Sequence, residues 1–215
     1  MADLIDEFVH IFEKPNGLPP FHRTNHKFLI LQGSNLVNVR SYKYPHFQKQ
    51  EIERLIREMM ETRLIQKKLQ LVLFPSLLVR KKDGSWQFCI DYRALKAITN
   101  KNRFPIPSID ELLDEIHGTH LFSKLDFCSG YHRMRMHEAN IHKTTFQTHE
   151  GHYEFLVMSF GLCNVPATFQ ATMNEIFQPY LWQFVIVFFD NILIYSKTLD
   201  EHLLHLRIIF LLFIN

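Results

Sequence analysis

Two apolar runs rich in Val, Ile, Phe and Tyr surround a polar pair, Asp190 and Asn191, at residues 184–196. Residues of these apolar types favour β-strands. Asp and Asn tolerate the positive φ that a two-residue hairpin turn requires. The pattern therefore predicts a buried hairpin, turned at Asp190-Asn191, with one carboxylate at its tip. An ordinary structural hairpin would account for the same residues.

Two further hairpins are expected around the turn residues Asp83-Gly84 and Glu150-Gly151. Their strands are residues 77–82, 86–91, 144–148 and 152–158. A short strand at residues 121–126 ends on Asp126. Basic side chains gather beside the first of these turns, at Arg80, Lys81 and Lys82. They indicate either a cationic hairpin tip or an ordinary solvated strand end.

Four segments carry the apolar spacing of an amphipathic helix: residues 50–65, 108–118, 164–177 and 198–210. Two of these helices begin with the spacing of a capping box, formed by Ser108 with Glu111 and by Thr198 with Glu201. Prolines and glycines interrupt residues 1–45, which are predicted to be an arm or linker. Hairpins and packed helices without βαβ alternation predict an α+β fold with an antiparallel sheet.

The bulk composition restricts the class of protein. Of 215 residues, 47% are hydrophobic and 21% are charged, as in ordinary globular proteins. The net charge is only +2, so a nucleic-acid partner would have to be bound by local basic patches. Neither a signal peptide nor a membrane-spanning run is recognisable. An intracellular protein, cytoplasmic or nuclear, with no membrane partner is expected.

Cysteine and histidine give no clear metal site. The three cysteines, Cys89, Cys128 and Cys163, lack CxxC spacing, which argues against a disulfide framework or a zinc site and fits a reducing compartment. Two histidine pairs could ligate a metal, His149 with His152 and His202 with His205. Solvated or core-satisfied histidines are the more frequent explanation of such pairs.

Many ordered blocks resemble the reverse transcriptases of gypsy-type LTR retrotransposons. Residues 184–196 are similar to the metal-binding hairpin of that family, in which the turn is Asp-Asp. The other matching blocks are residues 81–86, 91–95, 104–107, 111–113, 122–126, 129–132, 148–155, 160–162, 164 and 166–170. They extend from Leu18 to about Leu206, which is too many blocks for chance agreement.

The resemblance implies an RNA-directed DNA polymerase with an antiparallel palm sheet packed on helices, and with the thumb absent. After the arm at 1–45, the fingers would comprise about 46–118 and 140–163, and the palm about 119–139 and 164–215. The implied partners are an RNA or DNA template with its primer, and deoxynucleoside triphosphates. The sequence leaves the oligomeric state open.

Carried over by position, Asp126 and Asp190 would hold Mg²⁺, or Mn²⁺ in its place, and Asn191 occupies the position of the second turn Asp. Two divalent ions about 3.5–4 Å apart would clamp the attacking and leaving oxygens of phosphoryl transfer. Mg²⁺ prefers carboxylate oxygens, which suits these residues. The residues implied around the nucleotide are Lys81, Gln87, Tyr131, Phe160, Gly161 and Gln170.

Lys81 would grip the triphosphate, and Tyr131 would exclude a ribose 2′-hydroxyl. Each of these nucleotide-site residues also has an ordinary explanation. Tyr131 could be a core aromatic, Phe160 a packing residue and Gln170 a solvated helix residue.

Four features depart from the family pattern. Asn191 replaces Asp, Gln87 replaces an Arg that contacts triphosphate, residues 71–74 replace a Ser/Pro-rich segment, and the chain stops within or just after the palm. A unit charge pair at 4 Å corresponds to roughly 4 kcal/mol at a dielectric of 20, or on the order of a thousandfold in rate. The polymerase activity of this copy is therefore expected to be impaired.

Three alternatives remain open at this point. In the first, the enzyme is intact, with the Asn191 amide oxygen as a metal ligand and a thumb from another chain. In the second, the chain is a non-catalytic nucleic-acid-binding fragment. In the third, it is a decayed element copy, which the apolar run at 208–214 would suit because nothing in the sequence covers it.

Overall fold

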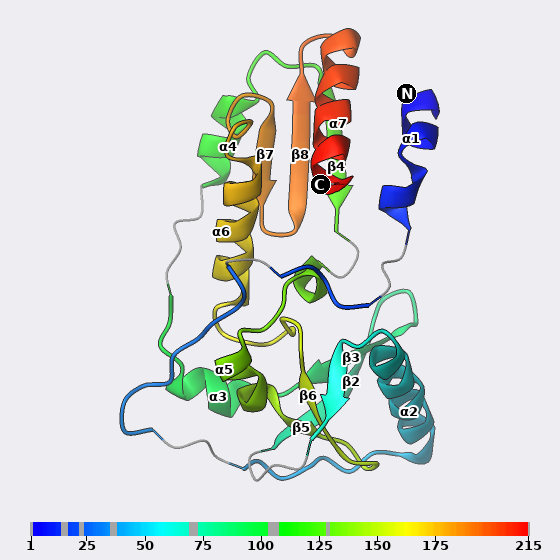
Figure 1. Cartoon of the computed structure of the whole chain (residues 1–215), viewed down its shortest axis with the longest axis vertical. Coiled ribbons are helices and arrows are strands. Elements are labelled where there is room, and N and C mark those ends of the chain that lie inside the picture. Colours follow the sequence, from blue (N-terminus) through cyan, green and yellow to red (C-terminus); the bar gives the residue numbers. More distant parts are fainter. Residues whose placement is uncertain are drawn as a thin grey trace. The chain divides into compact units, whose positions relative to one another are not determined.

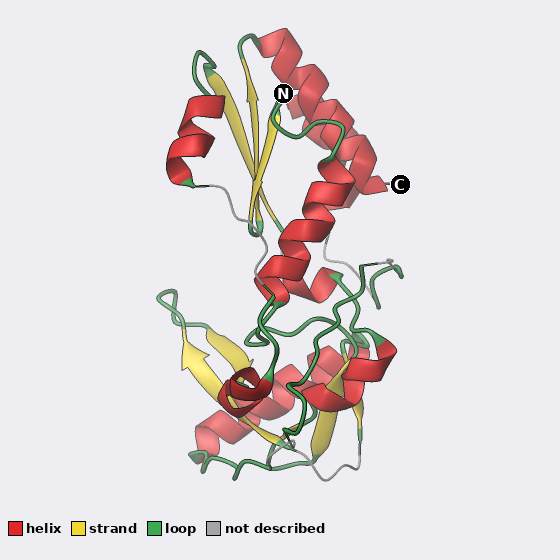
Figure 2. Cartoon of the chain, turned by 90° about the vertical axis from the view of Figure 1, so that its left-hand side faces the viewer, coloured by secondary structure: helices red, strands yellow, loops and turns green. Residues whose placement is uncertain are grey.

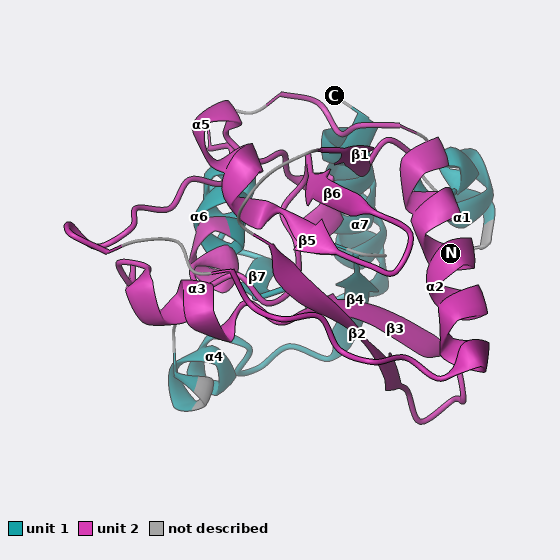
Figure 3. Cartoon of the chain, turned by 90° about the horizontal axis from the view of Figure 1, so that it is seen from below, with its two compact units in different colours: residues 1–15, 104–130, 169–215 teal, residues 16–103, 131–168 magenta. Residues whose placement is uncertain are grey.

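The computed structural model describes residues 2–13, 17–21, 24–34, 38–68, 73–102, 108–127 and 130–214. The chain forms two compact units, and each is built from segments that are distant in sequence (Figure 3). Unit 1 comprises residues 1–15, 104–130 and 169–215, and unit 2 comprises residues 16–103 and 131–168. Within the described ranges, no helix combines the length and apolar character needed to cross a bilayer.

Unit 1 contains a three-stranded antiparallel sheet in the order β4-β8-β7 (Figure 1). The strands are β4 (Leu121–Asp126), β7 (Val185–Phe188) and β8 (Asn191–Ser196). Its helical elements are α1 (Ala2–Glu7), η1 (Val9–Phe12), α4 (Ile109–Glu115), most of α6 (Val165–Phe177) and α7 (Leu199–Ile214). The strands run between α4 on one side and α7 on the other (Figure 2). This unit confirms the predicted antiparallel sheet packed on helices.

Histidines of α7 fix that helix to the sheet. The His202 Nε2 lies 2.8 Å from the Ser123 Oγ of β4, and its Nδ1 lies 2.9 Å from the Ser196 Oγ of β8. The His205 Nδ1 lies 2.8 Å from the same Ser196 oxygen, and its ring stacks on Phe184. Burial lowers the pKa of both histidines, which favours the neutral rings that these bonds use. The pair is therefore satisfied within the core.

The N-terminal segment packs on α7. Leu4 and Phe8 are buried, and the Phe8 ring lies 5.5 Å from that of Phe210. The Arg207 guanidinium donates two hydrogen bonds to the Glu7 carboxylate, at 2.8 and 2.6 Å. Residues predicted to lie in an arm or linker thus contribute side chains to unit 1. The helix predicted to end at residue 210 continues to Ile214, as its aromatic contacts in unit 1 continue beyond that residue.

Unit 2 contains a five-stranded sheet in the order β1-β6-β5-β2-β3. The strands are β1 (Ile65–Lys67), β2 (Phe74–Arg80), β3 (Trp86–Ile90), β5 (Phe146–Gln147) and β6 (His152–Phe155). The helical elements are α2 (His46–Glu61), α3 (Arg93–Ile98), α5 (Glu138–Ile141), most of η2 (Gly130–Arg133) and η3 (His142–Thr144). Both predicted hairpins are confirmed, and among the described strands of this sheet only β2 and β5 pair in parallel.

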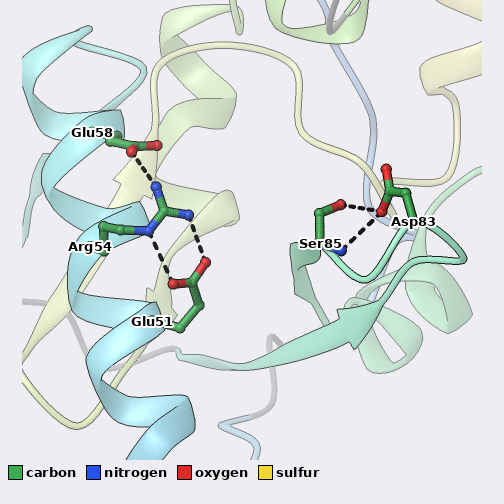
Figure 4. A network of polar contacts seen from close by, with 5 residues as sticks. All are labelled: Glu51, Arg54, Glu58, Asp83 and Ser85. Atoms are coloured by element: carbon green, nitrogen blue, oxygen red, sulfur yellow. Dashed lines mark hydrogen bonds and ion pairs between the residues drawn. The ribbon is translucent and has the colours of Figure 1, made fainter.

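Helix α2 begins and ends four residues earlier than predicted. It starts directly after Pro45, and Arg63 has a φ of 58° that turns the chain into β1. Its apolar face is as predicted, with Ile52 and Ile56 buried. On the exposed face, the Arg54 guanidinium binds the carboxylates of Glu51 and Glu58 (Figure 4). Exposed pairs of this kind contribute little stability.

Acid is expected to destabilise unit 2 through His26. This side chain is fully buried, its Nδ1 lies 2.9 Å from the Thr168 Oγ1, and its Nε2 has no hydrogen-bond partner among the described residues. Burial lowers its pKa from 6.5 to about 4. The unfolded chain then binds the proton more tightly than the folded one. His26 should leave stability unchanged above pH 6.5 and reduce it as the pH falls from there toward 4.

The His26 contribution amounts to about 2 kcal/mol of unfolding free energy between pH 7.5 and pH 5. Urea unfolding at both pH values measures it, with His26→Gln as the comparison. The substitution should reduce the difference in unfolding free energy between pH 7.5 and pH 5 by about that amount. If the natural protein and His26→Gln lose the same stability between pH 7.5 and pH 5, groups other than His26 cause the acid sensitivity.

Candidate functional site

The hairpin that carries the candidate metal ligands turns one residue earlier than predicted. Phe188 pairs with Asn191, so the two turn residues are Phe189 and Asp190, and Asn191 is the first residue of β8. Phe189 has a φ of 53°, a conformation that is costly for a residue with a Cβ. Its N–H donates to the Gln170 Oε1 at 2.8 Å. This tertiary bond accounts for the shift, because it overrides the local turn preference of Asp and Asn.

The pairing of β4 with β8 brings the predicted carboxylates to the same end of the sheet (Figure 1). Asp126, the last residue of β4, is the direct partner of Asn191, and Asp190 precedes Asn191 in the turn. Directly opposed residues of antiparallel strands have Cα atoms about 4.5–5.5 Å apart. The adjacency that the resemblance implied is therefore present in unit 1.

Both carboxylates have polar neighbours. The Lys124 Nζ lies 3.2 Å from the Asp126 Oδ1, with side chains that are 60% and 65% exposed. The Asn191 Nδ2 donates to the Asp190 Oδ1 at 3.3 Å. An ion pair this exposed is worth at most about 1 kcal/mol. It leaves the Asp126 carboxylate available to a more strongly bound cation.

The donor set suits a hard divalent cation. Carboxylate oxygens of Asp126 and Asp190 and the amide oxygen of Asn191 are of the type that Mg²⁺ and Mn²⁺ prefer. Within the described ranges, no cluster of three or more His, Cys, Asp or Glu side chains could hold a metal ion. The candidate site therefore relies on two carboxylates, and Asn191 supplies only a neutral oxygen.

Lys81 and Gln87 lie on one hairpin of unit 2. The Lys81 N–H donates to the Ser85 carbonyl at 2.8 Å, and Gln87 pairs with Val79 across the strands. The Asp83 Oδ1 accepts bonds from the Ser85 N–H at 2.9 Å and from its hydroxyl at 2.6 Å, which closes the turn (Figure 4). Lys81 is exposed beside this fixed turn, so the hairpin tip carries positive charge.

Tyr131, Phe160 and Gly161 also lie together in unit 2. The Tyr131 and Phe160 rings meet edge to face, with centroids 4.8 Å apart. Gly161 has a φ of 92°, and a Cβ there would lie 3.2 Å from the Ile90 carbonyl oxygen, so glycine is required. Tyr131 is half-buried and Phe160 exposed, which leaves one side of the pair accessible.

Gln170 is not a solvated helix residue, because its side chain is 1% exposed. Its Nε2 donates to the Val187 carbonyl and to the Asn174 Oδ1, both at 2.9 Å. Sequence reasoning placed this residue near the nucleotide and overlooked its bonds to the hairpin. Lys124 was also overlooked, although its i, i+2 spacing from Asp126 puts both on one face of a strand.

The predicted site residues are thus divided between the units. Unit 1 contains Asp126, Asp190, Asn191 and Gln170. The strand pairing brings Asp126 beside Asn191, and a hydrogen bond joins Gln170 to the turn that carries Asp190. Unit 2 contains Lys81 and Gln87 in one group, and Tyr131, Phe160 and Gly161 in another. Outside the described residues lie the matching block at 104–107, residue 129 of the block at 129–132, and residues 71–72 of the departing segment.

Known proteins resemble this chain over nearly its whole length. The family described as reverse transcriptase (RNA-dependent DNA polymerase) matches residues 79–213. The "Retrovirus-related Pol polyprotein from transposon 297" of Drosophila melanogaster is 40% identical over 98% of this chain and 20% of its own length. An "RNA-directed DNA polymerase homolog" of Oenothera berteroana is 45% identical over 58% of this chain and 90% of its own length. The chain thus spans about a fifth of the Drosophila polyprotein.

Solved structures support the same fold. A foamy viral protease-reverse transcriptase in complex with an RNA/DNA hybrid is similar with a TM-score of 0.81 and 20% identity, over 99% of this chain and 28% of that protein. The selenomethionine-labelled Prototype Foamy Virus enzyme gives a TM-score of 0.85 at 18% identity, over 99% and 28% of the two chains. The family match over residues 79–213 and the 45% identity to the Oenothera protein show that the chain belongs to the reverse transcriptase (RNA-dependent DNA polymerase) family.

Proposed function

We propose that this domain transfers nucleotides from deoxynucleoside triphosphates to a primer 3′-OH at a metal site formed by Asp126 and Asp190. The observation that carries the proposal is the pairing of Asp126 with Asn191, which brings the two carboxylates to one end of the β4-β8-β7 sheet. Mg²⁺ is the proposed ion, and Mn²⁺ can replace it because both accept hard oxygen ligands. The bound ions supply charge neutralisation for the reacting phosphate.

The template and primer are proposed to be RNA or DNA. The solved foamy viral enzymes were captured with an RNA/DNA hybrid and with double-stranded DNA, which supports nucleic-acid partners for a chain of the same fold. The matches to transposon polyproteins support an origin in an LTR element of gypsy type.

The unit 2 residues are proposed to hold the incoming nucleotide. Lys81 and Gln87 belong to the hairpin with the cationic tip, which suits contacts to the triphosphate. A guanidinium would bind two phosphate oxygens at once, whereas the amide of Gln87 would offer only weaker, uncharged hydrogen bonds. Tyr131 is proposed to exclude the ribose 2′-hydroxyl, with Phe160 and Gly161 forming the rest of the surface.

Activity is proposed to be weak in this copy. Asn191 lies opposite Asp126 and offers a neutral oxygen in place of a carboxylate. Gln87 further weakens the contact with phosphate. The first change lowers the attraction between the site and the metal ions, and the second lowers the attraction between the hairpin and the triphosphate.

Primer extension tests the proposal. The protein and its Asn191→Asp variant are compared side by side on a primed RNA template, with Mg²⁺ and then with Mn²⁺. We expect metal-dependent extension by the Asn191→Asp variant and little by the natural protein. If neither folded protein extends the primer but both bind primer–template in a salt-dependent way, a non-catalytic nucleic-acid-binding role is favoured, which the basic hairpin tip would support.

A further inference from the structure

Two consecutive residues of α6 contact the two segments that carry the candidate carboxylates. Gln170 bonds to Phe189, the residue before Asp190. The Phe169 ring lies 5.9 Å from that of Phe127, the residue after Asp126. We propose that Phe169 and Gln170 are positioning residues that set the separation of Asp126 and Asp190 from a single turn of α6. This inference rests on the proposed metal site.

Gln170 holds the turn from two sides. Its Oε1 accepts from the Phe189 N–H at 2.8 Å, while its Nε2 donates to the carbonyl of Val187 in β7 at 2.9 Å. A glutamine amide can accept and donate simultaneously, which neither Glu⁻ nor Met can do. Because Gln170 is buried, water does not compete for these bonds. The amide thereby stabilises Phe189 in its left-handed conformation.

Phe169 anchors the other segment through aromatic packing. Its ring meets Phe127 at an interplanar angle of 82°, and Phe127 also meets Phe213 of α7 at 5.5 Å. Gly130 is needed beside this contact, since a Cβ there would lie 3.0 Å from the Phe127 Cβ and 3.4 Å from the Phe169 Cζ. The chain that leaves β4 after Asp126 is therefore packed against α6.

A rigid helix is a suitable base for this arrangement. Neighbouring residues of a helix have fixed relative positions, so a displacement of one contact is resisted by the other. Metal ligands require placement within about 0.5 Å, which loops alone seldom provide. Asp190 lies in a turn and Asp126 at a strand end, and α6 links the two places.

The test compares Gln170→Met and Gln170→Glu with a matched control, Gln183→Met. Gln183 is an exposed glutamine of unit 1 whose Nε2 bonds to the Pro179 carbonyl. Backbone hydrogen exchange is followed at Phe189 and at Ile194 in the middle of β8. Loss of one hydrogen bond predicts about tenfold faster exchange at Phe189 in Gln170→Met. Ile194 should be unchanged, and Gln183→Met should change neither amide.

The Mn²⁺ dissociation constant of the folded proteins, measured by electron paramagnetic resonance, gives the functional readout. Gln170→Met should weaken Mn²⁺ binding about tenfold, the same factor that loss of the bond to the Phe189 N–H predicts for exchange. Gln170→Glu, which keeps the acceptor but loses the donor, should exchange more slowly at Phe189 than Gln170→Met. Urea unfolding is measured alongside, because a merely structural residue would lower stability without altering Mn²⁺ affinity.

Phe169→Leu provides the complementary test. It should speed backbone hydrogen exchange at Phe127 and leave exchange at Phe189 unchanged. Gln170→Met should speed exchange at Phe189 and leave exchange at Phe127 unchanged. Unchanged exchange at Phe189 and unchanged Mn²⁺ affinity in folded Gln170→Met would overturn the inference. Failure of the natural protein itself to bind Mn²⁺ would instead refute the proposed metal site, and the exchange data would still decide whether Gln170 holds the turn.

Discussion

Replacement of Asn191 by Asp is expected to raise the rate of Mg²⁺-dependent primer extension by on the order of a thousandfold. Residue 191 is the strand partner of Asp126 and follows Asp190, so a carboxylate there would lie beside both existing ones. One unit charge near a divalent ion, at about 4 Å and a dielectric of 20, corresponds to roughly 4 kcal/mol. The Asn191 amide, which now donates to Asp190, would be replaced by an acceptor.

Single-nucleotide incorporation at saturating primer–template measures this effect without interference from duplex release. Asn102→Asp serves as the control, because it adds the same charge at an exposed position of unit 2. It should leave the rate unchanged within about twofold, because Asn102 is not one of the proposed metal ligands and salt screens an exposed charge. A rate for the natural protein within tenfold of Asn191→Asp would show that the amide oxygen suffices.

Asp126→Asn, introduced into the Asn191→Asp protein, is expected to reduce incorporation by at least on the order of a thousandfold. Asp126 is the only carboxylate that β4 contributes to the strand ends in the described part of the sheet. Its loss would remove one of the ligands that lie on separate strands. The Lys124 ammonium, which pairs with Asp126 at 3.2 Å, would then be left as an uncompensated positive charge beside the metal position.

Asp114→Asn is the matched control for this second prediction. Asp114 is an exposed residue of α4 in the same unit. Its replacement by Asn removes one negative charge, as Asp126→Asn does. Rates are measured at several Mg²⁺ and Mn²⁺ concentrations, because weakened binding can be partly restored by more metal. Retention of more than a tenth of the rate in Asp126→Asn would remove Asp126 from the proposed ligands.

Local sequence signals predicted the local structure well. The strand at 121–126 agrees with β4 residue by residue. The capping box at Ser108 and Glu111 is present with both of its hydrogen bonds, at 2.7 and 3.3 Å. Asp83-Gly84 turns its hairpin through a positive φ at the glycine. In each case the interaction that decides the structure lies within a few residues of the signal.

Features that depend on long-range contacts could not be predicted in this way. The turn at 189–190 is shifted by a bond from Gln170, and the N-terminal segment is folded because Phe8 and Glu7 contact α7. No local pattern specifies either partner. The site residues were identified by resemblance, and the grouping of Asp126 with Asp190 and Asn191 came from the pairing of β4 with β8.

Mn²⁺ binding to the natural protein tests the central claim most directly, since it requires neither substrate nor activity. Electron paramagnetic resonance measures the free ion during titration of the natural protein, Asp126→Asn and Asp190→Asn. If Asp126 and Asp190 ligate the same ion, the natural protein should bind Mn²⁺. Asp126→Asn and Asp190→Asn should each weaken this binding at least tenfold, whereas Asp114→Asn should not. Equal Mn²⁺ affinity in all four proteins would contradict a metal site at the β4 end and the β7–β8 turn.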